Sequence, residues 1–196
     1  MVSSDAYFRY SDLSIREEEV IYSLLRNNFF VKEEEVKIDE VLPTYFDINQ
    51  KYPNTLIEIT FPIPYHDSFF QFFTYERWNL LKKVIKEIKV RRGEKREVLT
   101  LFRFNGFSNN LNSNLIFYIL NSSNRHFEMA LEKIEYIIDL LPNQVGILPN
   151  NVFELYYLYK ESLYKWFPFL IKTGNATETI NIYYFENGDW QLKKRK

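Results

Sequence analysis

Residues 44–61 read TYFDINQKYPNTLIEITF, two short alternating segments on either side of a turn-forming QKYPN. In the second segment Ile57 and Ile59 share one face and Glu58 lies on the other, because side chains alternate along a strand. If the apolar faces pack together, Asp47 and Glu58 emerge on the same side of a hairpin. Two carboxylates on adjacent strands supply the oxygen ligands that Mg²⁺ prefers. The stretch therefore predicts a magnesium site at Asp47 and Glu58.

Composition indicates a single domain with a substantial core. The chain has 196 residues, of which 18% are aromatic, no cysteine and two histidines. The absence of cysteine excludes disulfides and thiolate metal sites, and so few histidines leave little for zinc. No apolar run approaches the length of a membrane span, and the N-terminus lacks the pattern of a signal peptide. We expect a soluble, cytoplasmic protein.

Charge is distributed unevenly along the chain. Residues 1–70 carry 6 basic and 13 acidic side chains, whereas residues 71–105 carry 10 basic and 4 acidic ones. An acidic segment followed by a basic one suits a metal site beside a polyanion-binding surface. The alternative is that both segments are ordinary solvated helix and strand surface.

Local patterns predict the elements. Residues 1–12 carry no clear pattern. Ser14 with Glu17 three residues later forms a capping box that opens a helix. Further expected elements are a strand over 34–41, the strands of the quoted stretch, a helix over 74–92 that ends before Gly93, strands over 98–104 and 115–120, helices over 124–141 and 151–166, and a C-terminal hairpin around the Asn187-Gly188 turn.

These elements predict an α+β fold. The expected order is helix, three-stranded antiparallel meander over residues 34–61, helix and strand, followed by another strand, two helices and a C-terminal β-hairpin. We expect residues 1–120 to form the main core and residues 121–196 to form an extension packed on the same domain.

The order α-β-β-β-α-β, with Asp47 and Glu58-x-Thr60 on neighbouring strands, resembles the core of the PD-(D/E)XK nuclease superfamily. The resemblance covers roughly residues 14–104. It implies that Asp47 and Glu58 bind Mg²⁺ and that an acid of the first helix, Glu17 or Glu18, completes the site. The activity implied is metal-dependent hydrolysis of a phosphodiester in nucleic acid, with DNA the expected substrate.

The sequence departs from the family pattern at position 60. The family has a lysine two residues after the glutamate, and here that residue is Thr60, which cannot carry a positive charge. Either another lysine takes its place, with Lys37 the first choice and Lys82 and Lys86 the next, or the domain is a degenerate relative that only binds. For an active enzyme, the metal would lower the pKa of a bound water.

A basic helix would contact the nucleic-acid backbone under this hypothesis. Its residues are Lys82, Lys83, Lys86, Lys89, Arg91 and Arg92. His66, close to the strand that carries Glu58, is a candidate general base, although a solvated loop histidine is the simpler interpretation.

Two other functions are compatible with the sequence. The first is a non-enzymatic protein-interaction module, such as an inhibitor, immunity protein or assembly subunit. It predicts that acidic residues 33–35 and 39–40 contact a basic partner, and that the aromatic helix 151–166 contacts a protein partner or a second copy. The other is an RNA-binding ferredoxin-like half over residues 55–120, although its strands lack the usual aromatic-glycine signature. If Asp47 and Glu58 bind no metal, they are ordinary polar residues on the solvated face of an antiparallel sheet.

Overall fold

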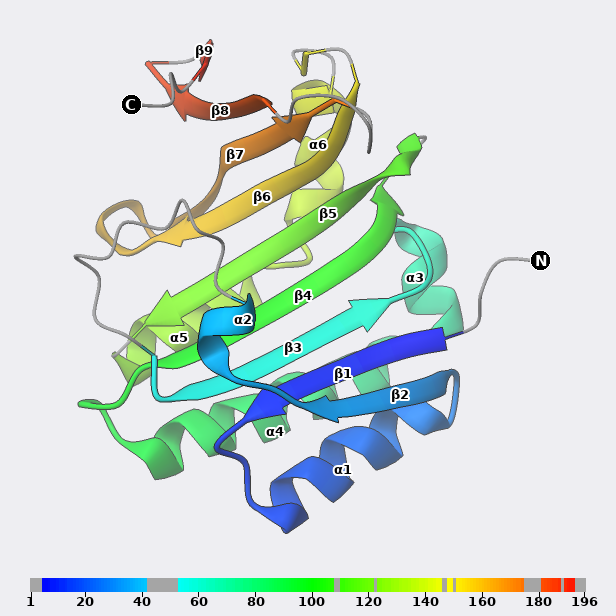
Figure 1. Cartoon of the computed structure of the whole chain (residues 1–196), viewed down its shortest axis with the longest axis vertical. Helices are drawn as coiled ribbons and strands as arrows, with labels where there is room; N and C mark the ends of the chain where they lie inside the picture. The colour runs from blue at the N-terminus through cyan, green and yellow to red at the C-terminus, as the bar shows by residue number, and fades with distance from the viewer. Residues whose placement is uncertain are drawn as a thin grey trace.

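The computed structural model describes residues 5–41, 53–107, 110–121, 123–145, 148–149, 151–174, 181–187 and 189–192. Within them the fold is α+β, as predicted from sequence (Figure 1). The elements are β1 Asp5–Ser11, α1 Ile15–Arg26, β2 Phe30–Glu35, α2 Ile38–Val41, β3 Thr55–Phe61, α3 Asp67–Phe72, α4 Tyr75–Arg92, β4 Val98–Phe107, β5 Asn110–Asn121, α5 Asn124–Glu132, α6 Ile137–Val145, β6 Val152–Lys160, the 3₁₀ turn η1 Glu161–Leu163, β7 Lys165–Thr173, β8 Asn181–Glu186 and β9 Asp189–Leu192.

One mixed sheet runs through the described residues in the order β2-β1-β3-β4-β5-β6-β7-β8-β9. The pairs β1–β2, β3–β4 and β5–β6 are parallel, and helices connect the two strands of each pair. Such crossovers are needed because a short turn cannot join parallel neighbours. The sheet is continuous across residue 120, so β5 of the predicted core pairs directly with β6 of the predicted extension.

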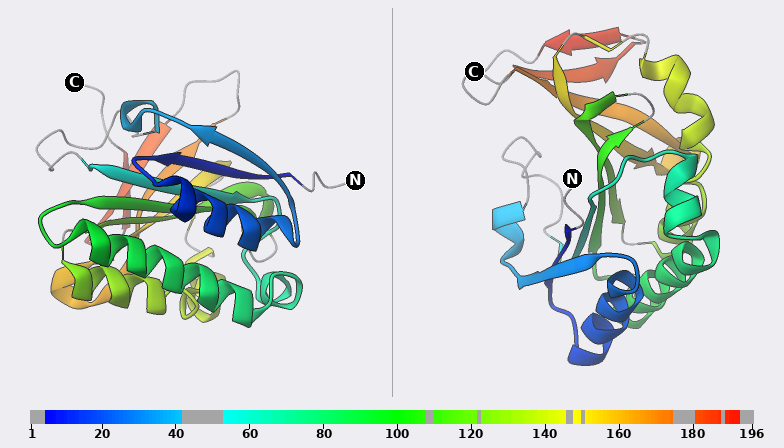
Figure 2. Two further views of the ribbon diagram at one scale, coloured as in Figure 1. Left: turned by 90° about the horizontal axis from the view of Figure 1, so that it is seen from below. Right: turned by 90° about the vertical axis from the view of Figure 1, so that its right-hand side faces the viewer.

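The helices divide unequally between the two faces of the sheet. Helices α1, α3, α4, α5 and α6 cover one face, and the short α2 lies on the other (Figure 2). The main core fills the covered face, where Ile57 and Ile59 of β3 pack with Trp78 and Leu81 of α4. We call the other side the open face. Its smaller apolar cluster includes Leu56, Leu99, Leu101, Ile116, Tyr118, Tyr156 and Leu170, with Ile38 of α2.

Several predicted elements are confirmed. Ser14 and Glu17 form the capping box of α1, and α4 ends at Gly93, whose φ of 78° suits glycine. The β4–β5 and β8–β9 pairs are antiparallel hairpins, and Asn187 of the second turn has a φ of 53°.

The predicted antiparallel meander is wrong in the described residues. Strand β2 begins at Phe30, earlier than expected, and residues 38–41 form α2. β2 pairs in parallel with β1, an element that we did not predict, and β3 pairs with β1 and β4. The signal for β1 is the alternation of Ala6, Phe8 and Tyr10, all of which are buried in the structure. Strand β2 lies at the sheet edge, where its mostly exposed side chains give little hydrophobic alternation.

The predicted helix over 151–166 is also wrong. These residues form β6, η1 and the start of β7. Tyr157 and Tyr159 face the helices while Tyr156 faces the open side, so the run is apolar on both faces. Such a run has no distinguishing period, and its aromatic residues favour a strand. Its buried position removes the basis for a partner surface on an aromatic helix. The helix expected over 124–141 is divided into α5 and α6.

Candidate functional site

Of the two predicted metal ligands, the structure describes Glu58 but not Asp47. Asp47 lies outside the described residues, so its distance from Glu58 stays untested. Glu58 lies on the open face of β3, as alternation predicted, but its side chain is almost completely buried at 1% exposure. Arg9 Nη2 lies 2.5 Å from Glu58 Oε2, an ion pair without hydrogen-bond alignment, and Arg103 Nε lies 3.8 Å from Oε1. Glu58 is therefore held between two guanidinium groups.

The charges continue from Glu58 across the open face. Arg103 Nη1 lies 2.8 Å from Glu154 Oε1, so the side chain from β4 reaches over β5 to β6. Lys172 Nζ lies 2.6 Å from Glu154 Oε2, to which Tyr156 also donates a hydrogen bond of 2.7 Å. We call Arg9, Glu58, Arg103, Glu154 and Lys172 the open-face ion ladder. Its cations and carboxylates alternate across the sheet, so each carboxylate lies between two positive groups.

The open-face ion ladder keeps the carboxylate of Glu154 ionised although that side chain is partly buried. Burial by itself would raise the pKa of Glu154, but the Arg103 charge, the Lys172 and Tyr156 hydrogen bonds and the Lys172 charge together lower that pKa below its ordinary value. The arrangement suits a structural network. A divalent cation at Glu58 would have to displace an arginine from the same carboxylate.

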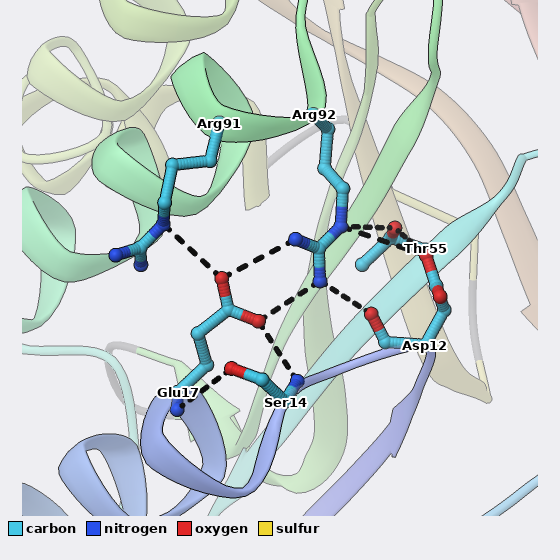
Figure 3. A network of polar contacts seen from close by, with 6 residues as sticks. All are labelled: Asp12, Ser14, Glu17, Thr55, Arg91 and Arg92. Carbon is cyan, nitrogen blue, oxygen red and sulfur yellow. Dashed lines mark hydrogen bonds and ion pairs between the residues drawn. The ribbon is translucent and has the colours of Figure 1, made fainter.

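Glu17 belongs to a different network on the covered face (Figure 3). Its carboxylate accepts the Ser14 N–H at 2.9 Å and Arg92 Nη2 at 2.9 Å, and Arg91 Nε lies 3.2 Å away. Burial would raise the pKa of Glu17, but the hydrogen bonds from Ser14 and Arg92 lower it. Arg92 also donates to Thr55 Oγ1 at 3.2 Å, so the network connects α1, α4 and β3.

The structure does not bring Glu17 and Glu58 into one site. Helix α1 packs its Ile21 and Leu25 against the covered face, whereas Glu58 points to the open face of the sheet. Lys37, the expected substitute for the family lysine, is exposed between β2 and α2. Among the described residues no group of three or more His, Cys, Asp and Glu side chains is placed to hold a metal ion.

The predicted backbone-binding cations mostly contact this chain instead. Lys86 Nζ lies 3.0 Å from Glu128 and 2.8 Å from Glu132, both on α5. Lys82, one turn earlier on α4, is paired with Glu135. These ion pairs hold α4 against the α5–α6 region, and they neutralise the positive charges of Lys82 and Lys86.

Lys89, Arg91 and Arg92 lie near the C-terminal end of α4, and each contacts other groups of this chain. Lys89 is buried and donates to the carbonyls of Gly93 at 2.8 Å and Arg96 at 3.1 Å. Burial lowers the pKa of Lys89. Arg91 and Arg92 bind Glu17, as described above. Of the six predicted cations only Lys83 is exposed and free of a described ion pair.

The outer edge of the sheet carries acidic side chains that, unlike most of the cations of α4, have no described partner of opposite charge. Glu33, Glu34 and Glu35 of β2 are exposed, and Glu18 of α1 is close enough to Glu33 to influence its pKa. We call Glu18, Glu33, Glu34 and Glu35 the acidic edge. No ion pair within the described part of the chain neutralises any of the four. Glu34 is the register partner of Arg9, whose guanidinium is engaged by Glu58.

The acidic edge has electrostatic consequences for its own side chains. Partial burial and the neighbouring Glu18 raise the pKa of Glu33. Burial and the same carboxylates raise the pKa of Tyr10, which lies beside them on β1. Like charges held together in this way are typical of functional surfaces, although structural clusters also show them.

The histidines have local roles. His66 is exposed and caps α3, where its Nδ1 accepts the Ser68 N–H at 3.3 Å. His126 Nδ1 lies 3.2 Å from Glu161 Oε2 at the β6–β7 turn, and its ring contacts Tyr164. An open depression of about 550 Å³ adjoins His126 and Tyr164.

Comparison with known proteins returned no family model, no curated protein and no solved structure that matches this chain. The resemblance to PD-(D/E)XK nucleases therefore stays a prediction. No helix among the described residues is long and apolar enough to cross a membrane.

Proposed function

We propose that this protein is a non-enzymatic interaction module that binds a basic protein partner through its acidic edge. The observation that carries the proposal is the run of three exposed carboxylates, Glu33, Glu34 and Glu35, on the outermost strand of the sheet, where no described ion pair neutralises them. Elsewhere the chain surrounds its buried carboxylates with arginine and lysine. A surface that keeps like charges together at a cost in stability is suited to a partner that supplies the missing positive charge.

The sheet edge gives this surface a defined shape. Register places Glu33 beside Phe8 and Glu35 beside Tyr10 on the covered side, with Glu34 on the open side. Phe30, at the start of the same strand, is 78% exposed. Asp39 and Glu40, which we also predicted to contact a basic partner, are exposed on α2. The edge thus offers carboxylates on both sides and one large apolar side chain, a combination suited to protein recognition.

The proposal is tested with two fluorescein-labelled nine-residue peptides of one composition. One has lysine at every second position, and the other has its lysines at helical spacing. We expect at least one to bind, and the Glu33→Gln/Glu34→Gln/Glu35→Gln variant to bind it about tenfold more weakly, with the difference shrinking as salt rises.

The matched control removes three charges from another surface. Glu76, Glu87 and Glu94 are exposed and belong to no described ion pair, so Glu76→Gln/Glu87→Gln/Glu94→Gln changes net charge equally. We expect this control to bind like the unmodified protein. Failure of both peptides to bind, or equal weakening in the two triple variants, would overturn the proposal.

A metal-dependent nuclease is the alternative, and it receives less support. Glu58 is enclosed by Arg9 and Arg103, and Glu17 lies on the other side of the sheet. We expect no cleavage of plasmid or short duplex DNA with Mg²⁺ or Mn²⁺. Cleavage that disappears in both Glu58→Ala and a folded Glu58→Gln variant would establish the nuclease instead.

A further inference from the structure

We propose that the partner adds an extended, basic segment as a new strand on the free edge of β2. This inference rests on the proposed function and specifies the form of the partner. Among the described strands none pairs with the outer side of β2, which has β1 as its neighbour on the inner side. An unpaired edge presents backbone donors and acceptors that an incoming extended segment can satisfy.

The backbone direction along β2 identifies the outward groups. Val36, directly after the strand, donates its N–H to Tyr10 O on β1 at 2.9 Å. Backbone groups alternate between the two sides of a strand, so Lys32 and Glu34 also face β1. The N–H and C=O groups of Glu33 and Glu35 therefore face away from the sheet. Two of the three glutamates of β2 therefore combine an outward-facing backbone with a carboxylate side chain.

The side chains then define the sequence of the added strand. Glu33 and Glu35 lie on the covered side and are two residues apart, and Glu33 has Glu18 of α1 as a neighbour. A strand paired with them places its own alternate residues on that side. Lysine or arginine at two positions separated by one residue meets these carboxylates. An apolar residue near the start of β2 meets the exposed Phe30.

The charge pattern selects against a second copy of this chain. Two β2 edges paired together would place carboxylates opposite carboxylates, which destabilises a strand pair. Charged edges commonly prevent self-association, and here the same charges favour a partner of opposite sign. A basic strand from another protein is thus the occupant that the edge accepts.

Two substitutions at one position separate backbone pairing from charge recognition. Glu33→Gln removes the carboxylate and keeps the outward N–H, whereas Glu33→Pro removes both. Proline is tolerated on an edge strand at a position where the N–H of the residue it replaces faces solvent. With the alternating-lysine peptide, we expect Glu33→Gln to weaken binding about threefold and Glu33→Pro at least about tenfold.

The outcomes distinguish the two proposals. If Glu33→Gln and Glu33→Pro weaken peptide binding equally, strand addition is overturned and charge recognition is retained. If neither Glu33 variant binds the peptide more weakly than the unmodified protein, both proposals are overturned. Dimerisation of the peptide-free protein through β2, seen by sedimentation velocity and lost in Glu33→Pro, would overturn the choice of a basic partner.

A second measurement covers the case in which Glu33→Pro fails to fold. The alternating-lysine peptide is N-methylated at every second residue, which blocks the donors along one of its edges and leaves this protein unchanged. Of the two possible methylation registers, we expect one to reduce affinity at least about tenfold and the other to reduce it much less. Equal affinity of both methylated peptides and the parent peptide would contradict strand addition.

Discussion

The open-face ion ladder and the acidic edge lie on neighbouring strands but handle charge in opposite ways. In the ladder, Glu58 is buried and Glu154 is partly buried, and each lies between two cations. At the acidic edge, Glu33 and Glu18 are neighbours of the same sign. The register pair Arg9 and Glu34 marks the boundary, because Arg9 turns its charge toward Glu58.

This molecule uses charge for stability in its interior and leaves charge without a described ionic partner at its solvated edge. A buried carboxylate without a cation would be very costly, so the ladder had to be neutralised internally. A carboxylate at a solvated edge costs much less and can remain available to a partner. The comparison therefore assigns a structural role to the ladder and a recognition role to the edge.

The largest effect is expected from breaking the ladder at Arg103. Removal of the Arg103 side chain leaves the buried Glu58 and the partly buried Glu154 with one cation fewer each. We expect Arg103→Ala to lower the free energy of unfolding by about 3–5 kcal/mol, measured by urea denaturation. The exposed Lys83 provides the control, since Lys83→Ala should change stability by less than about 0.5 kcal/mol. A loss below about 1 kcal/mol for Arg103→Ala would contradict the structural role of the ladder.

A smaller loss is expected at Glu17, with a clear dependence on pH. Its pKa is lower in the folded protein, so its charged form stabilises the fold above the ordinary carboxyl pKa. That contribution disappears as pH falls through the lowered folded value. We expect Glu17→Gln to cost about 1–3 kcal/mol at pH 7 and much less in acid near pH 2. A cost independent of pH would mean that packing, and not charge, explains the loss.

The smallest effect is expected at Glu33, and its sign is reversed. The pKa of Glu33 is raised in the folded protein, so its contribution is favourable below the ordinary carboxyl pKa and is lost as pH rises through the raised value. Glu33→Gln should therefore increase stability at pH 7 by about 0.3 kcal/mol and have no stabilising effect near pH 4. Thermal unfolding at the two pH values measures this. Destabilisation at pH 7 would show that the acidic edge is structural after all.

Sequence patterns predicted the local features of this fold better than its long-range ones. The capping box at Ser14 and Glu17, the end of α4 at Gly93 and the two hairpins depend on neighbours in sequence, and all were predicted. The parallel pairing of β2 with β1 depends on residues that are distant in sequence, and this pairing was not predicted.

The candidate site shows the same limit more strongly. Alternation placed Glu58 opposite Ile57 and Ile59, which is confirmed, but nothing near Glu58 in sequence indicates Arg9 or Arg103 as its partners. The acidic run at 33–35 was visible in the sequence. Its position on a free edge, with no described cation to neutralise it, required the fold.

The most direct test of the edge as a partner surface is amide hydrogen exchange by NMR, with and without the alternating-lysine peptide. We expect peptide binding to slow exchange of the Glu33 and Glu35 amides by about tenfold or more, while Lys32 and Glu34, already bonded to β1, change less. Unchanged exchange at Glu33 and Glu35 under saturating peptide would contradict a role of this edge as a partner surface.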